Sequence, residues 1–204
     1  VYDEYPYHAD GRAYVNKKRA SLFIYNMIDG QLTPVSEPLF QTNQIMNSRV
    51  NPVISPDRKR IYYWGEVVTN TNSRACDAYV YYIESKKSRK LFTNDKYMLT
   101  QCLEWMGRVY FVGHDLKEDF YGIDLMSVSP EGGDYRVEVV PDDYLIGAAA
   151  MDDCLWLVYA RHDKTDIFRW TPGEEPEYLF SPEYVIEGRI ERACDTCFFT
   201  GRRP

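Results

Sequence analysis

The sequence lacks the features that mark several large classes of protein. It contains no apolar run of about 18 residues, the length that a membrane-spanning helix needs. Basic residues are the minority, because 24 Lys and Arg stand against 31 Asp and Glu, for a formal net charge of -7. Nucleic-acid binding relies on a clustered basic surface, so we expect neither nucleic acid nor a membrane as a partner.

Both ends of the sequence lack the marks of natural termini. The first residues, Val1 to Tyr5, include no Met and do not show the basic-then-apolar order of a signal peptide. The last residues, Gly201 to Pro204, follow closely on a strand-like run. We therefore expect the chain to be a fragment of a longer protein.

Cysteine is scarce and irregularly spaced. The five cysteines are Cys76, Cys102, Cys154, Cys194 and Cys197. An odd number scattered through strand-like runs favours a reduced, cytoplasmic protein over a disulfide scaffold. Cys194 and Cys197 have the CxxC spacing of zinc and redox sites, but zinc needs two more ligands and a redox motif would open a helix. We interpret this spacing as a coincidence.

Aromatic residues, by contrast, are abundant. They make up 15% of the chain, with 18 Tyr among 204 residues. Tyr is favoured on half-buried pleated sheets. No segment has a sustained helical period with caps, and the region from Met27 to Leu39 is broken by Gly30, Pro34 and Pro38. The composition therefore favours an all-β protein.

One pattern recurs four times along the chain. Each copy has a turn with acidic residues or Gly, an alternating aromatic and apolar strand, a polar loop, a second alternating strand, a hairpin turn and a short strand. Ile61, Val109 and Trp156 lie at corresponding places, 48 and 47 residues apart. This spacing is close to the length of a propeller blade, about 45 residues. A β-sandwich, the rival architecture, does not require the same order of strands to recur.

We therefore predict an all-β fold, a partial β-propeller of about four antiparallel sheets whose ring is not closed within this chain. The approximate blades are residues 1–50, 51–100, 101–147 and 148–193, and residues 194–200 begin a further strand. An open arc leaves apolar flanks and unpaired strand edges exposed, so we also predict self-association through these open flanks.

Two polar loops are expected to shape one face of the ring. They run from Gly65 to Asp77 and from Gly113 to Asp124. Loops of this kind carry the partner-binding groups or the channel mouth of a propeller. A calcium site between Asp115 and Asp124 is not predicted, because the acidic residues do not follow the order of a calcium loop and no Gly takes its sixth place.

Several stretches resemble a known family. Ser55–Ile61 reads Ser-Pro-Asp-Arg-Lys-Arg-Ile and is similar to the Ser-Pro-Asp-Gly-Lys-Arg-Ile motif of TolB-like and peptidase propellers. Arg58 replaces the usual Gly, so we expect the turn to need a non-Gly conformation or an alternative geometry. Further stretches resemble the acylaminoacyl-peptidase-like branch of the prolyl oligopeptidase family: Asp3–Tyr7, Asp10–Tyr14, Asn16–Arg19, Gly113–Asp115, Leu125–Val128 and Glu131–Asp134.

The resemblance covers most of residues 3–145 and implies a parent enzyme in two parts. In this family a propeller covers an α/β-hydrolase domain that carries the catalytic Ser, Asp and His, and it restricts entry to short peptides. The present sequence has no G-x-S-x-G nucleophile elbow. We therefore predict a non-catalytic propeller region of a serine oligopeptidase, whose partners are short peptides and a hydrolase domain absent from this chain.

No catalytic, cofactor-binding or metal-binding residue is predicted in the chain. The three histidines, His8, His114 and His162, could each act as a general base, but no nucleophile is fixed beside any of them, and we interpret them as surface or turn residues. Some relatives bind a substrate amino terminus with a Glu-Glu pair. Glu174 and Glu175 form such a pair in a hairpin turn without the helical context of that motif, so the role is not transferred.

The sequence bears on two other functions besides the peptidase. A TolB-like propeller that acts as a protein–protein interaction platform is the alternative, because the acidic balance and aromatic strands permit it. A small independent enzyme has little support, since the sequence has no Gly-rich phosphate loop, no clustered metal ligands and no nucleophile motif.

Overall fold

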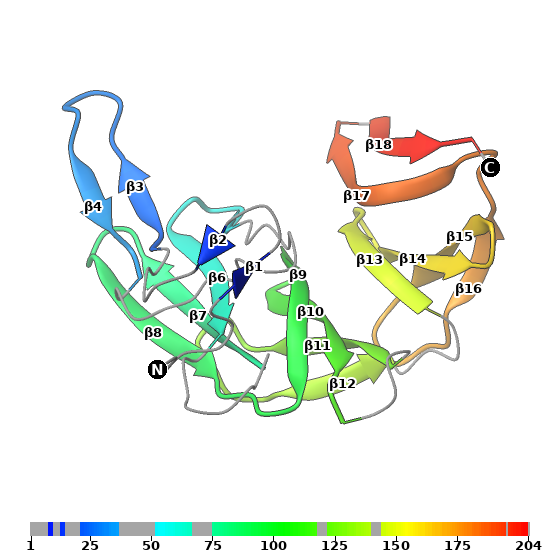
Figure 1. The fold of residues 1–204 in the computed structure, drawn as a ribbon, viewed down its shortest axis with the longest axis horizontal. Coiled ribbons are helices and arrows are strands. Elements are labelled where there is room, and N and C mark those ends of the chain that lie inside the picture. The colour runs from blue at the N-terminus through cyan, green and yellow to red at the C-terminus, as the bar shows by residue number, and fades with distance from the viewer. Residues whose placement is uncertain are drawn as a thin grey trace. The chain divides into compact units, whose positions relative to one another are not determined.

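A computed structural model describes residues 8–9, 13–14, 21–36, 52–66, 75–117, 122–139, 144–194 and 196–203. All the regular structure in these ranges is β-strand (Figure 1), so no helix within them is long and apolar enough to cross a membrane. The chain divides into two units, Val1–Tyr97 and Met98–Pro204, and each is described by itself.

The first unit contains two small sheets and one full sheet. The small sheets are the pairs β1 (His8–Ala9) with β2 (Ala13–Tyr14), and β3 (Phe23–Tyr25) with β4 (Leu32–Pro34). The first full sheet has four antiparallel strands in sequence order: β5 (Val53–Ile54), β6 (Arg60–Glu66), β7 (Cys76–Tyr82) and β8 (Lys87–Phe92).

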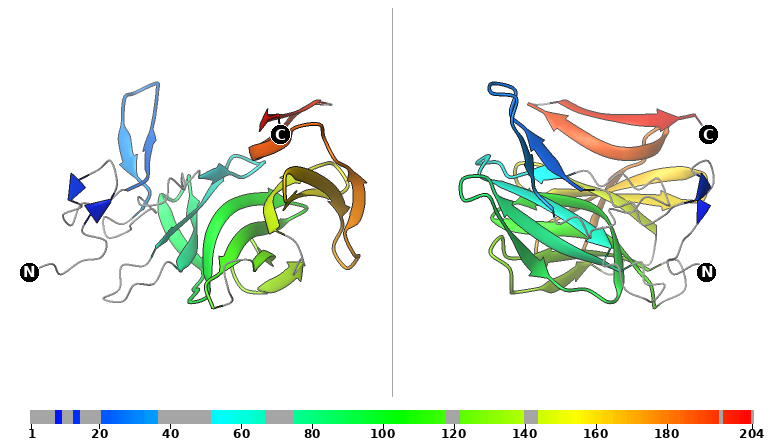
Figure 2. Two further views of the ribbon diagram at one scale, coloured as in Figure 1. Left: turned by 45° about the vertical axis from the view of Figure 1, so that its right-hand side comes forward. Right: turned by 60° about the vertical axis from the view of Figure 1, so that its left-hand side comes forward.

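The second unit contains two full sheets and a hairpin. The second full sheet consists of β9 (Tyr97–Trp105, which starts at the unit boundary), β10 (Arg108–Asp115), β11 (Ile123–Val128) and β12 (Arg136–Val139). The third full sheet consists of β13 (Tyr144–Ala150), β14 (Leu155–Arg161), β15 (Lys164–Trp170) and β16 (Glu177–Phe180). The hairpin is β17 (Val185–Ala193) with β18 (Thr196–Arg202). Every sheet is built from strands consecutive in sequence, and the full sheets are twisted (Figure 2).

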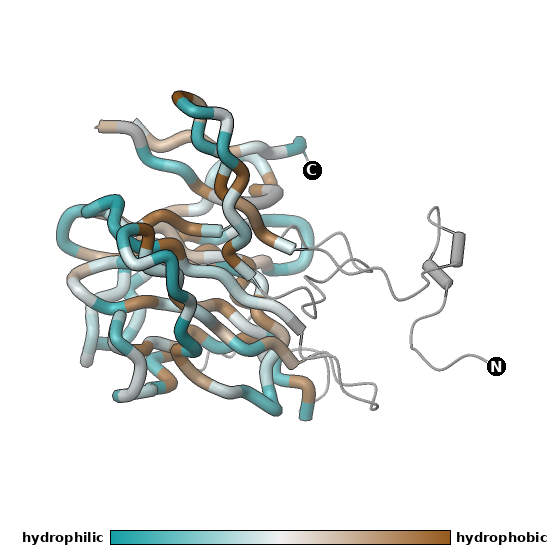
Figure 3. The backbone as a smooth tube through the Cα atoms, turned by 90° about the vertical axis from the view of Figure 1, so that its left-hand side faces the viewer, coloured by the Kyte–Doolittle hydropathy of each residue, from teal (hydrophilic) through white to brown (hydrophobic). Residues whose placement is uncertain are grey.

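Burial decreases from the middle of each full sheet to its last strand. The central strands are buried on both faces, as in β11, where every residue from Ile123 to Val128 is buried. The last strands are the most exposed, as in β16, where all four residues are exposed. Figure 3 shows the hydropathy of each residue along the backbone, with hydrophobic stretches in the strands and mostly hydrophilic turns. An exception is the turn of the β3–β4 hairpin, where Met27 and Ile28 are 89% and 96% exposed.

In the first unit the core lies between the β3–β4 hairpin and the first full sheet. It is made of Val35, Ile61, Tyr63, Tyr79 and Tyr81, with Leu22 and Ile24 packed against them. Tyr63 and Tyr79 stack with ring centroids 5.2 Å apart. The Ser88 hydroxyl donates a hydrogen bond to the Val35 carbonyl at 2.7 Å, so polar contacts also hold the segment that follows β4 against this sheet.

In the second unit the core lies between the second and third full sheets. Its buried residues are Trp105, Tyr110, Val112, Ile123, Leu125, Val139, Leu145, Ala148, Leu155, Leu157, Tyr159 and Trp170. The buried Gln101 amide joins the two sheets, because its Nε2 donates to the Ala148 carbonyl at 2.6 Å and its Oε1 accepts from the Ala148 amide at 2.8 Å. Gly147 leaves room for this amide, since a Cβ there would lie 3.0 Å from the Gln101 Oε1.

The β17–β18 hairpin packs on the outer side of the third full sheet. Ile186 and Ile190 of β17 form an apolar cluster with Ala149, Val158 and Ile167. The Ile186 amide also donates a hydrogen bond of 2.9 Å to the buried Thr165 hydroxyl. A second, smaller core therefore lies on the face of the third full sheet opposite the main core of this unit.

The recurring sequence pattern corresponds to the second, third and fourth strands of each full sheet. It does not include the first strands, β5, β9 and β13. These strands are hard to recognise in the sequence, because β5 has two residues, β9 alternates apolar residues with Thr100, Gln101 and Glu104, and β13 is rich in Ala. The division into blades at residues 50, 100, 147 and 193 stays a prediction.

Candidate functional site

The Ser-Pro-Asp turn joins β5 to β6 through a network centred on Ser55. Its hydroxyl donates to the Asp57 carboxylate at 2.5 Å and accepts from the Arg60 amide at 2.9 Å. The Asp57 carboxylate also accepts from the Lys59 amide at 3.0 Å. The hydrogen bond from Ser55, then that from the Lys59 amide and the charge of Arg60, lower the pKa of Asp57.

Arg58 adopts the left-handed conformation that Gly favours. Its φ is 58°, and its amide donates to the Ser55 carbonyl at 2.9 Å. The expectation that the turn would need a non-Gly conformation or an alternative geometry at Arg58 is therefore wrong. The turn keeps its shape because the Ser55 and Asp57 contacts hold it, and Arg58 accepts the strain of a left-handed residue.

Among the described residues of the first unit, Asp77 is the most enclosed charged group, with 1% of its side chain exposed. Lys90 of β8 places its Nζ 2.7 Å from the carboxylate, and the Asn94 amide donates to it at 3.0 Å. The Tyr79 hydroxyl donates to the same carboxylate at 3.3 Å. Burial first, and then the Asp77 charge, raise the pKa of Tyr79 well above its usual value. Asp77 thus fixes the chain where it leaves the outer strand, β8.

An aspartate recurs at the same place in all three full sheets. Asp77, Asp124 and Asp166 are buried near the start of the third strand and lie opposite Gly65, Gly113 and Tyr159 on the second. The Asp166 carboxylate accepts a short hydrogen bond from the Ser181 hydroxyl, immediately after β16.

In the first and third full sheets, therefore, a buried aspartate holds the segment that follows the outer strand.

The expected loops from Gly65 to Asp77 and from Gly113 to Asp124 need a correction at their ends. These end residues are paired in strands, and the middle of each loop lies outside the described residues.

Gly113, His114 and Asp115 end β10. His114 is half-buried, and its ring meets Tyr144 edge to face with centroids 5.7 Å apart. Burial lowers the pKa of His114 and raises that of Tyr144. The buried Asp115 carboxylate accepts from the Lys117 amide at 2.9 Å, and the Asp115 amide donates to the Gly122 carbonyl at 2.7 Å. The motif thus closes the strand and positions the start of the β10–β11 loop.

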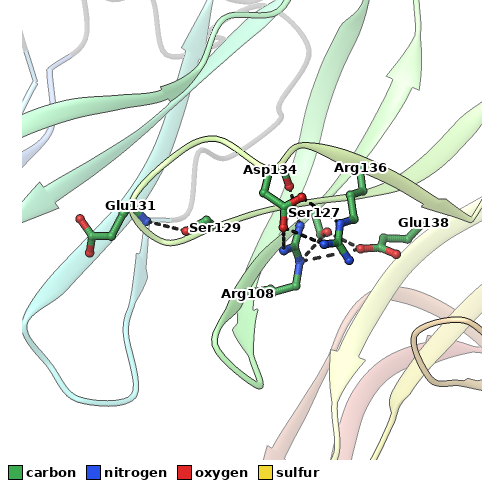
Figure 4. Close-up of polar contacts among 7 residues, drawn as sticks. All are labelled: Arg108, Ser127, Ser129, Glu131, Asp134, Arg136 and Glu138. Carbon is green, nitrogen blue, oxygen red and sulfur yellow. Dashed lines mark hydrogen bonds and ion pairs between the residues drawn. The ribbon is translucent and has the colours of Figure 1, made fainter.

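A charged cluster lies where β10, β11 and β12 meet (Figure 4). Arg108 donates through Nε to the Ser127 hydroxyl at 2.9 Å and through Nη1 to the Asp134 carboxylate at 2.6 Å. Arg136 also pairs with Asp134 at 2.8 Å, and the Ser127 hydroxyl donates a short hydrogen bond to Glu138. The hydrogen bonds from Arg108 and then from Arg136 lower the pKa of Asp134.

The geometry of this cluster suits a structural latch. Ser127 is completely buried, so a substrate has no access to its hydroxyl. Two guanidinium groups are matched by the carboxylates of Asp134 and Glu138, which balances the charge within the cluster. The cluster therefore ties the β11–β12 turn to the start of β10 and offers no activated nucleophile.

The residues considered as general bases lie on different elements of the chain. His8 is in β1, and its side chain is outside the described residues. His114 ends β10, as described above, whereas His162 is exposed in the β14–β15 turn with φ of 51°. The interpretation as a surface turn residue is confirmed for His162, but it is wrong for His114, which is half-buried and paired with Ile123 in a strand. The absence of catalytic residues stays a prediction.

The Glu-Glu pair and the acidic loop also have defined places. Glu174 and Glu175 are exposed in the β15–β16 turn, where Glu174 accepts a short hydrogen bond from the Thr171 hydroxyl. Within the described part of the chain, no three His, Cys, Asp or Glu side chains gather as metal ligands would. The loop between Asp115 and Asp124 is only partly among the described residues, and so are the family-like stretches between residues 3 and 19.

The residues that follow each buried aspartate would have predicted its position from the sequence. Each one is followed by two apolar residues, as Asp-Ala-Tyr, Asp-Leu-Met and Asp-Ile-Phe. A charged residue at a fixed place in a repeated strand is typical of a buried, paired group.

Comparison with known proteins identifies the fold. No protein-family profile and no curated protein matches the chain in sequence. Among solved structures, the β-propeller domain of the Trilobed protease from Pyrococcus furiosus, described as having an open velcro topology, is 15% identical with a TM-score of 0.57, over 88% of this chain and 54% of that one.

Two enzymes show a similar degree of likeness. Acylaminoacyl peptidase from Pyrococcus horikoshii is 18% identical with a TM-score of 0.56, over 82% of this chain and 29% of that one. Oligogalacturonate lyase from Vibrio parahaemolyticus is 10% identical with a TM-score of 0.59, over 84% of this chain and 50% of that one. This chain thus spans between about a quarter and a half of their length.

Likeness at these identities shows the fold alone. The chain is a partial β-propeller of antiparallel sheets, and the prediction of an all-β propeller is confirmed. Its structural neighbours include propellers of prolyl oligopeptidase-type and acylaminoacyl peptidase enzymes. They also include a lyase, so the activity of the whole protein has to be argued from the sequence motifs.

Proposed function

We propose that this chain is the propeller region of a serine peptidase of the prolyl oligopeptidase family, in its acylaminoacyl-peptidase-like branch. In this proposal the propeller gates and selects short peptides for an α/β-hydrolase domain outside these 204 residues, and the propeller itself performs no bond-breaking step. The odd number of cysteines, scattered through the strands, supports a reducing, cytoplasmic location.

The placement of the family-like stretches in the fold carries this proposal. Ser55–Ile61 forms the turn that leads into β6, and Gly113–Asp115 ends β10, so both motifs lie at strand ends of full sheets. Loops at the strand ends of a propeller line the two faces of the ring, where a channel opens. The peptidases among the structural neighbours agree with this assignment.

The size filter follows from the rigidity of the sheets. Buried aspartates hold the segments that follow the outer strands β8 and β16. The Arg108 cluster holds the β11–β12 turn. In this proposal, rigid sheets keep the loops at their own ends in place, and an opening lined by such loops admits a short peptide and excludes a folded protein. Binding and positioning of the peptide, rather than chemistry, are thus the propeller's contribution.

Activity-based labelling tests the proposal. The full-length protein and the 204-residue chain are treated with a fluorophosphonate probe and assayed with an acetylated peptide anilide. We expect the full-length protein to be labelled on a serine outside residues 1–204 and to cleave the anilide, and the chain alone to do neither. Labelling of the chain itself, or cleavage of oligogalacturonate instead of peptides by the full-length protein, would overturn the proposal.

A protein-interaction platform is the second candidate, and a specific observation favours it. The β3–β4 hairpin exposes five large apolar side chains: Phe23, Tyr25, Met27, Ile28 and Leu32. Exposed apolar residues gathered on one element mark interaction surfaces. A full-length protein that lacks a hydrolase domain and is captured through this hairpin would favour the platform over the peptidase.

We also propose that the isolated chain self-associates. In β18, Phe198 and Phe199 are 54% and 38% exposed, and among the described strands β18 pairs with β17 alone. Apolar residues beside an open strand edge favour pairing with another chain. Light scattering is expected to show a dimer that dissociates in the double variant Phe198→Lys with Thr200→Lys. A monodisperse monomer at high concentration would contradict it.

A further inference from the structure

Three sulfur-bearing residues lie on neighbouring segments at one end of the β17–β18 hairpin, and two of them are in direct contact. Cys194 is the first residue of the two-residue turn after β17, has φ of 53° and is exposed. Cys197 is the second residue of β18 and is half-buried. Its Sγ lies 3.9 Å from the Sδ of Met151, which follows β13 and is far away in the sequence. The fold thus adds a thioether to the CxxC pair.

A set of charged and backbone contacts fixes this arrangement. Arg192 donates through Nη1 and Nη2 to the two carboxylate oxygens of Asp152 at 2.6 and 2.7 Å, and through Nε to the Cys194 carbonyl at 2.8 Å. The Met151 carbonyl accepts from Trp105 Nε1 at 2.9 Å. The loop that carries Met151 and the turn that carries Cys194 are therefore tied together by one arginine.

The donor set determines which ion such a site would take. Thiolates and thioethers are soft ligands that select Cu(I), whereas a structural zinc site needs four ligands from Cys, His or carboxylates. Among the described residues no third Cys, His, Asp or Glu completes a group with the two cysteines. Three sulfur atoms match the low coordination number that Cu(I) accepts, and the exposed Cys194 gives the ion a path of entry.

We propose that Cys194, Cys197 and Met151 form a Cu(I)-binding site at the end of the β17–β18 hairpin. The two cysteines coordinate as thiolates, so binding of one Cu(I) releases two protons to the solvent, and the ion keeps its oxidation state. Met151 supplies the third bond as a neutral ligand. The site is independent of the proposed peptidase function, because it lies on residues that no step of that function uses.

A competition titration tests the site. The purified 204-residue chain is titrated anaerobically with Cu(I) buffered by bicinchoninic acid, in the presence of ascorbate. We expect one Cu(I) per chain, three Cu–S bonds in the X-ray absorption spectrum, and an affinity at least about tenfold weaker in Cys194→Ser and in Cys197→Ser. Cys194 is exposed, so its variant is expected to fold, and circular dichroism checks this.

Matched methionine variants separate a site from adventitious thiol binding. Met151→Leu is expected to weaken Cu(I) binding and to reduce the Cu–S bonds from about three to about two. Met106→Leu, at an exposed methionine in the β9–β10 turn, is expected to change neither quantity. Equal affinities in the two methionine variants, retained binding in Cys194→Ser, or tighter binding of Zn(II) than of Cu(I) would overturn the proposal.

Discussion

Asp77 of the first full sheet and Asp166 of the third occupy the same place but are held by different partners. Asp77 is bound by Lys90 of the outer strand at 2.7 Å and by the backbone of Asn94. Asp166 has Arg161 and Lys164, from the β14–β15 hairpin, at 3.4 and 3.6 Å, and the Ser181 hydroxyl. The place in the sheet thus decides the burial of the carboxylate, while nearby side chains decide how it is neutralised.

The largest effect is expected from Asp77→Asn. This substitution leaves the Lys90 ammonium without its buried carboxylate and weakens the contact to the Asn94 amide. We expect a loss of about 2 to 3 kcal/mol in the free energy of unfolding, measured by urea denaturation. Glu84→Gln, at an exposed turn residue of the same sheet, serves as the control and should change stability little. A loss as small as that of the control would show that Asp77 does not hold the outer strand.

Asp166→Asn is expected to have a smaller effect. Its cations are farther from the carboxylate than Lys90 is from that of Asp77, and the amide of Asn can still accept the hydrogen bond from Ser181. We expect a loss of about 1 to 2 kcal/mol by the same measurement. Asp163→Asn, in the exposed turn beside it, is the matched control. A loss larger than that of Asp77→Asn would reverse the ranking of the two sheets.

The turn before the second strand also differs between the first and third full sheets. The substitution Arg58→Gly tests this difference. The third full sheet uses a shorter turn, in which the Met151 amide donates to the Cys154 carbonyl at 2.9 Å. In the first, Gly at position 58 would remove the strain of a left-handed Arg, partly offset by the greater freedom of Gly in the unfolded chain. We expect the free energy of unfolding, measured by thermal denaturation, to increase by about 0.5 kcal/mol. Lys59→Gly, where no such strain exists, should lower stability instead.

The smallest effect concerns the pH dependence of the same turn. The folded protein lowers the pKa of Asp57 from its ordinary value of 3.8, so the carboxylate stabilises the fold above that pH. This contribution disappears as the pH falls through the lowered, folded-state value. Wild type is therefore expected to exceed Asp57→Asn in melting temperature at about pH 6, and the gap should close in stronger acid. A gap that is constant across this range would contradict the assignment.

The sequence was sufficient for the repeated strands because their pattern depends on local burial. Strands such as β6 and β10 are continuous aromatic and apolar runs, so they were recognisable without a structure. Among the first strands, β9 is hard to recognise in the sequence because it contains Gln101. The Gln101 amide is satisfied only through its contact with Ala148 in another sheet. A polar residue that is satisfied by a distant backbone looks like a loop residue in sequence.

The turn at Arg58 shows the opposite error. The sequence suggested that Arg would change the turn, because Arg rarely takes positive φ. The Ser55 and Asp57 hydrogen bonds outweigh that preference and keep the left-handed conformation. Local propensity is thus overridden when several contacts determine one residue.

By itself the sequence determined the repeat, the strand type and the resemblance to a peptidase propeller, since each depends on residues close together in the chain. Only the tertiary structure decided which charges are buried and what they bind. Asp77 and Asn94, or Cys197 and Met151, are brought together by strand pairing and sheet packing. Such contacts depend on the path of the chain between the residues, and no local pattern records that path.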